Sequence, residues 1–223
     1  MSHLRIAGKL MLVVVLLLAG TVAHSQGRHA RFMQVTSIGK FKPGFYTLLD
    51  GSRHGGKLRV WQDLERNVVQ VEQGKADPIN LQTADLQGFT IGTDSFAVVR
   101  QVAMVGAPTE KPFGEAEFFR VMLTGRIQVL QHDQLMRSHN TVGHLNIWLL
   151  RMSPESAIVG LPYEQSAFAQ HASTLFVDNP LLCQRIRAGL VGPDDFKRII
   201  YAYLFKREIE QVSYEEAANI FRQ

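Results

Sequence analysis

The chain has 223 residues, 46% of them hydrophobic, and a formal net charge of +4. This composition allows a substantial buried core in one large domain or two small ones. A single cysteine, Cys183, excludes an intramolecular disulfide, and the interleaving of basic with acidic residues excludes a basic patch for nucleic acid.

The first 25 residues have the order of a secretory signal peptide. Arg5 and Lys9 precede an unbroken apolar run at residues 10–19, and small and polar residues follow this run. A membrane-spanning helix needs roughly 20 predominantly apolar residues, so this run is too short. We therefore expect contact with the membrane only during export, and a location in the periplasm or outside the cell.

Cleavage is expected between Ser25 and Gln26, because Ala23 and Ser25 are small residues at the two positions that the cleaving peptidase reads. Cleavage after Ala23 is the alternative. Without Arg5 and Lys9, the 24 Lys and Arg residues become 22 against an unchanged 20 Asp and Glu. The mature protein of about 198 residues would therefore have an excess of only two positive charges.

Residues 26–34 lack apolar periodicity and are expected to form a flexible leader. A β-rich body is expected at 35–161, because short extended runs alternate there with turn residues. Its opening hairpin would pair 45–49 with 57–61 across a turn at 50–56, where glycines supply positive φ. Leu58 and Val60 would lie on one face of this hairpin and Lys57, Arg59 and Trp61 on the other, as expected of a sheet with one side in water.

Further strands are expected at residues 68–72, 89–93 and 96–102, with a short edge strand at 79–81. Asp77-Pro78, Gly74, Gly88 and Gly92 would mark breaks between these strands. A Pro- and Gly-rich loop follows at 106–112.

A second hairpin would pair residues 118–123 with 126–131 across Thr124-Gly125. The first of these arms could instead be a helix, because its apolar residues do not alternate strictly. Two more strands are expected at 145–152 and 156–161.

Residues 162–223 are expected to form a helical segment that packs on the body. Helix formers at 163–172 predict the first helix, and Asn179-Pro180 is typical of the start of a second helix that would end at Gly189. Another helix would follow Pro193. Ser213 and Glu216 form a capping box for the last helix. The sequence thus predicts an α+β fold, with an antiparallel β-rich body followed by a helical C-terminal third.

The candidate metal ligands are His132, Asp133, His139 and His144, since imidazoles and carboxylates bind zinc-like ions. Their spacing matches no common ligand motif, and residues 134–138 are expected to form a loop that fixes neither flanking histidine. We therefore favour solvated loop histidines over a metal site, and no metal or cofactor is predicted.

Motifs for nucleophilic catalysis do not occur in this sequence: it has neither a G-x-S-x-G elbow nor S-x-x-K. Cys183 and His171 could act together only if the fold brought them into contact. Cys183 lies among apolar residues, which favours a buried, unreactive thiol.

Several stretches together resemble a broad group of uncharacterised exported proteins from Gram-negative bacteria. The stretches are 44–51, 56–58, 85–89 and 119–130. Gln131 stands where that group usually has a tyrosine, and the turn at 52–55 also differs. The resemblance implies an exported protein with a β-rich body and a helical C-terminus, and it implies no functional residue.

The export signal and the lack of catalytic spacing predict a non-enzymatic binding or structural protein of the cell envelope. Its partner would be a protein or another envelope component, not nucleic acid. The alternative is a small-ligand-binding protein or hydrolase with a site around His132, His139 and His144.

Overall fold

The computed structural model describes residues 37–62, 67–100, 102–104, 115–138 and 141–221. All of these except Ser37 belong to one unit, Ile38–Gln223. The expected signal peptide with its cleavage point at Ser25 and Gln26, the leader at 26–34, the loop at 106–112 and His139 lie outside the described residues.

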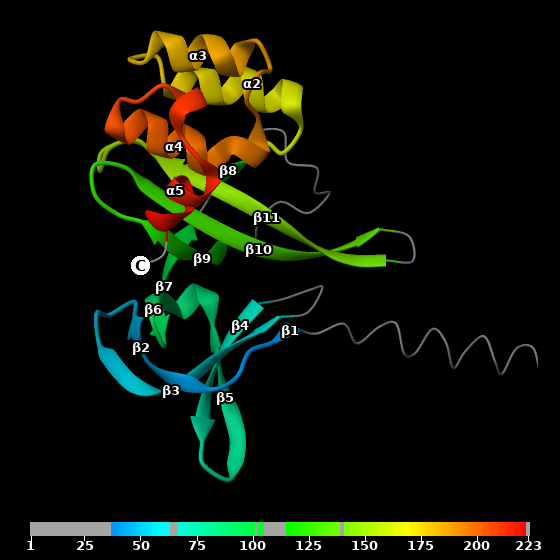
Figure 1. Cartoon of the computed structure of the whole chain (residues 1–223). Helices are drawn as coiled ribbons and strands as arrows, with labels where there is room; N and C mark the ends of the chain where they lie inside the picture. Colours follow the sequence, from blue (N-terminus) through cyan, green and yellow to red (C-terminus); the bar gives the residue numbers. More distant parts are fainter. Residues whose placement is uncertain (1–36, 63–66, 101, 105–114, 139–140, 222–223) are drawn as a thin grey trace, which may run out of the picture. The chain divides into compact units, whose positions relative to one another are not determined.

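Strands occupy the first part of the described chain and helices the last part (Figure 1). The strands are β1 (Ser37–Ile38), β2 (Lys42–Leu48), β3 (Arg53–Gln62), β4 (Asn67–Gln73), β5 (Ala76–Gln82), β6 (Leu86–Ile91), β7 (Asp94–Arg100), β8 (Ala103–Met104), β9 (Ala116–Leu123), β10 (Gln128–Ser138), β11 (Thr141–Arg151) and β12 (Val159–Gly160). The α-helices are α2 (Gln165–Leu175), α3 (Pro180–Arg187), α4 (Phe196–Phe205) and α5 (Tyr214–Asn219), and the 3-10 helices are η1 (Thr83–Asp85), η2 (Pro193–Asp195) and η3 (Ile209–Gln211). The α+β class predicted from the sequence is confirmed.

The strands join in one sheet in the order β5-β4-β3-β2-β6-β7-β9-β10-β11-β12-β8. Neighbours from β5 to β12 pair antiparallel, and only β12 with β8 pairs in parallel along this path. Pro78 lies inside β5 and does not break it, contrary to the prediction. The reason is that β5 ends the sheet order, where a missing N–H interrupts no central hydrogen-bond ladder.

Both predicted hairpins are present, with different turns. Strand β3 begins at Arg53, so the first turn is shorter than the predicted span 50–56. The arm at 118–123, for which a helix was the alternative, is strand β9. Gly88 was expected to break the chain but lies within β6, opposite Ala97 of β7, because its missing side chain leaves room for the backbone oxygen of Phe96.

The prediction of a loop at residues 134–138 is wrong. Strand β10 continues to Ser138 and pairs with β11 from Gln128↔Arg151 to Ser138↔Thr141. The polar residues of this segment do not alternate with apolar ones, so the sequence showed no sign of a strand. The strand forms because the long hairpin supplies its hydrogen bonds.

The C-terminal helices begin and end at the predicted signals. Asn179 Oδ1 accepts a hydrogen bond from Leu182 N at 3.2 Å at the start of α3, and Gly189 follows this helix with φ +69°. Ser213 Oγ accepts from Glu216 N at 3.1 Å and begins α5. Capping satisfies N–H groups that have no partner inside the helix, which is why these signals could be read locally.

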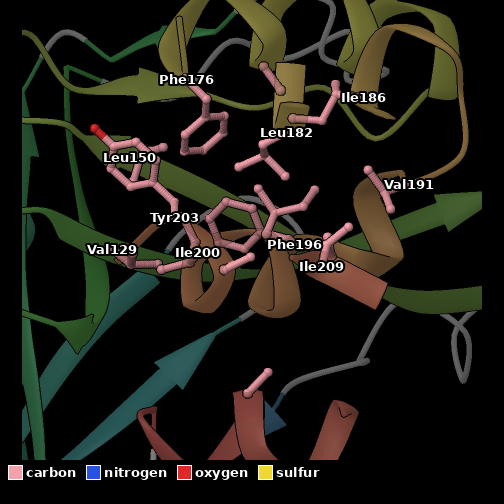
Figure 2. Packing of buried hydrophobic residues seen from close by; sticks show 14 of the residues in the cluster. Val129, Leu150, Phe176, Leu182, Ile186, Val191, Phe196, Ile200, Tyr203 and Ile209 are labelled. Atoms are coloured by element: carbon pink, nitrogen blue, oxygen red, sulfur yellow. The ribbon is translucent and has the colours of Figure 1, made fainter. Parts of the chain in front are cut away.

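The largest group of buried apolar residues lies between the helices and one face of strands β9–β11. Val129 and Leu150 come from the strands, and Phe196, Ile200 and Phe176 come from the helical segment (Figure 2). Leu149, next to Leu150, points to the opposite face and is also fully buried. The sheet is therefore covered on both sides here, which fits the apolar run at residues 147–150 of this strand.

A separate apolar cluster fills the N-terminal part of the sheet, around Leu58, Val69 and Phe89. Gln62 at the end of β3 donates from Nε2 to Asp133 O of β10 at 2.9 Å. Because β3 and β10 are far apart in the sheet order, this bond shows that the sheet bends back on itself.

Candidate functional site

A cavity of ≈ 360 Å³ lies at the start of α3 and the end of α4. We call it the α3–α4 pocket. Its wall is made by Asp178–Leu182 and Arg185, by Tyr203, by Lys206–Glu210, and by Arg126 from the loop between β9 and β10.

The floor of the α3–α4 pocket is part of the main core. Leu182, Tyr203 and Ile209 are at most 9% exposed and pack with the other core residues (Figure 2). Leu182 and Tyr203 belong to the apolar stripes of α3 and α4, which face the core, and Ile209 comes from η3. A rigid apolar floor of this kind holds the polar rim in place.

Tyr203 connects the floor to the rim. Its hydroxyl donates to Asp178 Oδ2 at 2.9 Å, and Arg126 Nη2 lies 3.9 Å from the same oxygen. Burial, followed by the hydrogen bond to Asp178, raises the pKa of Tyr203, so the phenol stays protonated and continues to donate.

The other arginines of the wall have carboxylate partners. Arg185 Nε lies 2.8 Å from Glu210 Oε1, although its N–H is not directed at that oxygen, so the contact is an ion pair without a hydrogen bond. Arg207 Nη1 pairs with Glu216, and the hydrogen bond from Tyr201 together with this arginine lowers the pKa of Glu216. Glu216 therefore remains ionised and keeps Arg207 in place.

Lys206 differs from the other basic residues of the wall. It makes no ion pair within the part of the chain that the structure describes, and its backbone is left-handed, with φ 52° and ψ 42°. Lys206 was not among the functional candidates predicted from the sequence. The sequence carries no signal for this conformation, because glycine is the residue that usually marks a left-handed position after a helix and here a lysine occupies it.

His132, the first candidate metal ligand, is 3% exposed and lies against Phe119 on the inner face of β10, so its interpretation as a solvated loop histidine is wrong. Its Nδ1 is 2.9 Å from Phe118 O. Burial lowers its pKa, against the opposing effects of the Phe118 hydrogen bond and the charges of Glu117 and Asp133. The ring is therefore held neutral and acts as a packed, hydrogen-bonded core residue.

The remaining candidate ligands do not complete a metal site in the described structure. Asp133 is exposed and, as the next residue in a strand, points to the face opposite His132. His144 pairs through its backbone with Leu135, but its side chain is outside the description, as is all of His139. Among the described residues, no group of three or more His, Cys, Asp or Glu side chains could hold a metal ion.

A polar cluster around His132 was not expected from the sequence. Asn67 Nδ2 donates to Glu117 Oε2 at 3.2 Å, and Thr83 Oγ1 donates to Asn67 O at 3.1 Å. These residues come from β4, β9 and η1, so no local pattern could have brought them together. They meet because the sheet bends back on itself.

Cys183 is buried, as predicted. Its Sγ lies 3.0 Å from Ser173 O and 2.9 Å from Phe176 O, to which the thiol donates. Burial raises its pKa, which disfavours the reactive thiolate. The contacts of the sulfur are thus with backbone carbonyls of α2 and the residue that follows it.

Comparison with protein-family models, with curated proteins and with solved structures found no match to this chain. Within the described residues, no helix has the length and apolar character needed to cross a membrane.

Proposed function

We propose that the protein is an exported, non-enzymatic binding protein of the cell envelope that holds a small ligand in the α3–α4 pocket. The observation that carries this proposal is the cavity of ≈ 360 Å³ with an apolar floor and a charged rim. Ligand sites commonly fall in the range of about 300–1,000 Å³ and combine apolar walls with a few placed polar groups.

The chemistry of the described nucleophile and base candidates supports binding over catalysis. The Cys183 thiol is buried with a raised pKa, and His132 is buried among aromatic rings. A nucleophile needs a polar, partly exposed setting and a base within reach. Neither group has access to the pocket wall, which consists of other residues.

Export remains part of the proposal and is supported by the order of residues 1–25: a basic start, an apolar run and small residues before Gln26. A mature envelope protein without a disulfide must depend on its packed core for stability. The extensive apolar packing between the helices and strands β9–β11 is suitable for that role.

The pocket can be tested by filling it. Leu181 is 43% exposed and lines the pocket, whereas Val177 is 66% exposed, lies four residues away and is not part of the wall. Wild type, Leu181→Trp and Val177→Trp would be purified gently from envelope extracts and compared by native and denaturing mass spectrometry. We expect a small molecule on wild type and Val177→Trp that is lost on denaturation, and its loss from Leu181→Trp.

Wild-type protein that carries no small molecule, or equal retention by Leu181→Trp, would contradict ligand binding in this pocket. Recovery of a stoichiometric protein partner by all three proteins would instead support a contact surface elsewhere. Circular dichroism of the two tryptophan variants checks that each is folded.

A further inference from the structure

We propose that the ligand of the α3–α4 pocket carries an anionic group, a carboxylate or a phosphate, and that Lys206 binds this group. The inference rests on the proposed function, because it names the chemical class of ligand for the same site. Three features of the pocket carry it: the pairing of its charges, the backbone at Lys206, and the position of the neighbouring donors.

The wall contains the cations Arg126, Arg185, Lys206 and Arg207 and the anions Asp178, Glu208 and Glu210. Each arginine lies beside a carboxylate: Arg126 by Asp178, Arg185 by Glu210, and Arg207 by Glu216, which is outside the wall. Lys206 has no such partner among the described residues. An anion that enters the pocket would therefore meet Lys206 without displacing an existing ion pair.

Among the described residues, Glu208 is the one acid of the wall that belongs to none of these ion pairs. Its Oε2 accepts a hydrogen bond from Gln211 Nε2 at 3.3 Å, so it already has a polar partner. A cationic ligand would have to use Glu208, whereas an anionic ligand would use Lys206. The two possibilities give opposite preferences for ligand charge and can be separated by experiment.

The backbone at Lys206 also points to a role for its side chain. Every other described residue with positive φ is a glycine, at positions 51, 74, 92, 125 and 189. A side chain in the left-handed region is sterically strained, and glycine avoids this strain. A lysine at this position weakens the fold slightly while placing an ammonium group at the pocket, and strain of this kind is typical of binding sites.

The neighbouring groups favour an anion close to Lys206. Arg126 is 63% exposed and only loosely paired, at 3.9 Å from Asp178, so its guanidinium can turn toward a ligand. Asp178 already accepts a hydrogen bond from Tyr203 and lies beside Arg126, so it has polar partners other than Lys206. The start of α3 adds the positive end of a helix dipole to the same wall.

The test is to titrate the mature protein with inorganic phosphate, acetate or choline at constant ionic strength. Two-dimensional ¹⁵N NMR would monitor the amide shifts during each titration. We expect phosphate or acetate to give saturable shifts at amides of the pocket, such as Leu181 and residues 206–210. Choline should give none. The anion that binds with the lower Kd shows whether the negatively charged group of the ligand is a phosphate or a carboxylate.

Three variants assign the binding to Lys206. Lys206→Gly removes the ammonium and relieves the backbone, so we expect binding to weaken about tenfold or more without a lower melting temperature. Lys206→Arg keeps the charge and should stay within about threefold of wild type. Lys75→Ala removes an equal charge from an exposed turn outside the pocket and should leave binding unchanged.

Unchanged anion binding by Lys206→Gly would overturn the inference, and so would saturable shifts with choline. Shifts spread over the whole surface would indicate an adventitious ion only and would also overturn it. If Leu181→Trp loses its bound molecule while Lys206→Gly binds anions as wild type does, the pocket remains the ligand site and only the assigned ligand class fails.

Discussion

At the scale of single residues, burial changes the chemistry that a side chain offers. His132 was a candidate metal ligand in the sequence, but it lies between Phe118 and Phe119 with Nδ1 beside a backbone carbonyl. Removing the ring from water disfavours its charged form. The same residue type that suggests metal binding in an exposed loop therefore contributes here to packing and to the pH dependence of stability.

The lowered pKa of His132 predicts loss of stability in mild acid. The unfolded chain takes up a proton near pH 6.5, whereas the folded chain resists it, so the free energy of unfolding falls as pH drops below about 6.5. The charges of Glu117 and Asp133 oppose this effect and reduce it. The largest slope for one such group is about 1.4 kcal/mol per pH unit.

Urea unfolding of wild type and His132→Gln between pH 5 and pH 7.5 would measure this slope. We expect the variant to lose less stability toward pH 5, because Gln does not titrate. His54→Gln, at an exposed position, should follow wild type. Equal slopes for wild type and His132→Gln would show that His132 is not responsible.

At the scale of elements, close backbone approach decides which glycines are required. Gly44 of β2 and Gly56 of β3 are direct partners in the sheet. A Cβ on Gly44 would lie 2.0 Å from Thr90 O, part of the β6 backbone, whereas one on Gly56 would meet Val71 Cγ1 at an ordinary 3.4 Å. The two glycines look alike in sequence and differ only in what lies across the sheet.

We predict that Gly44→Ala destabilises the protein by about 2 kcal/mol or more, because β2 and β6 must separate to admit the methyl group. Gly56→Ala should change stability by about 1 kcal/mol or less, since it meets no backbone and reduces the freedom of the unfolded chain. Urea denaturation of both variants at neutral pH measures the difference. Similar losses in both would contradict the close approach at Gly44.

At the scale of the whole molecule, the bent sheet and the helical segment bury two large apolar clusters and leave the α3–α4 pocket at the rim of one of them. The pocket is formed by residues from the β9–β10 loop, α3 and the segment after α4. The proposed ligand site thus depends on the helices being packed on the sheet, and unfolding of the core would remove it.

The proposed export also concerns the whole chain, and it predicts the mass of the mature protein. Intact-mass measurement on protein from the periplasmic fraction should find a chain that begins at Gln26, or at His24 if cleavage follows Ala23. Leu16→Arg, which places a charge in the apolar run, should leave the precursor in the cytosol. Wild-type protein that keeps Met1 and stays in the cytosol would refute export.

The sequence by itself determined the features that depend on neighbouring residues. Alternation and turn glycines indicated the strands, and Asn179, Gly189 and Ser213 indicated helix ends, because capping and positive φ act within a few residues. The α+β class followed from the order of these local signals. Errors arose at Pro78, Gly88 and 134–138, where pairing with another strand outweighs local preference.

Only the tertiary structure decided which side chains meet. Gln62 reaches the backbone of Asp133, and Lys206 shares a cavity wall with Arg126 and Asp178, across long stretches of chain. The reason is physical: the energy that brings such residues together comes from burying apolar surface throughout the core, and this is not encoded by the spacing of the polar residues themselves. The sequence suggested a site around the histidines, whereas the fold forms the pocket at the start of α3 and the end of α4.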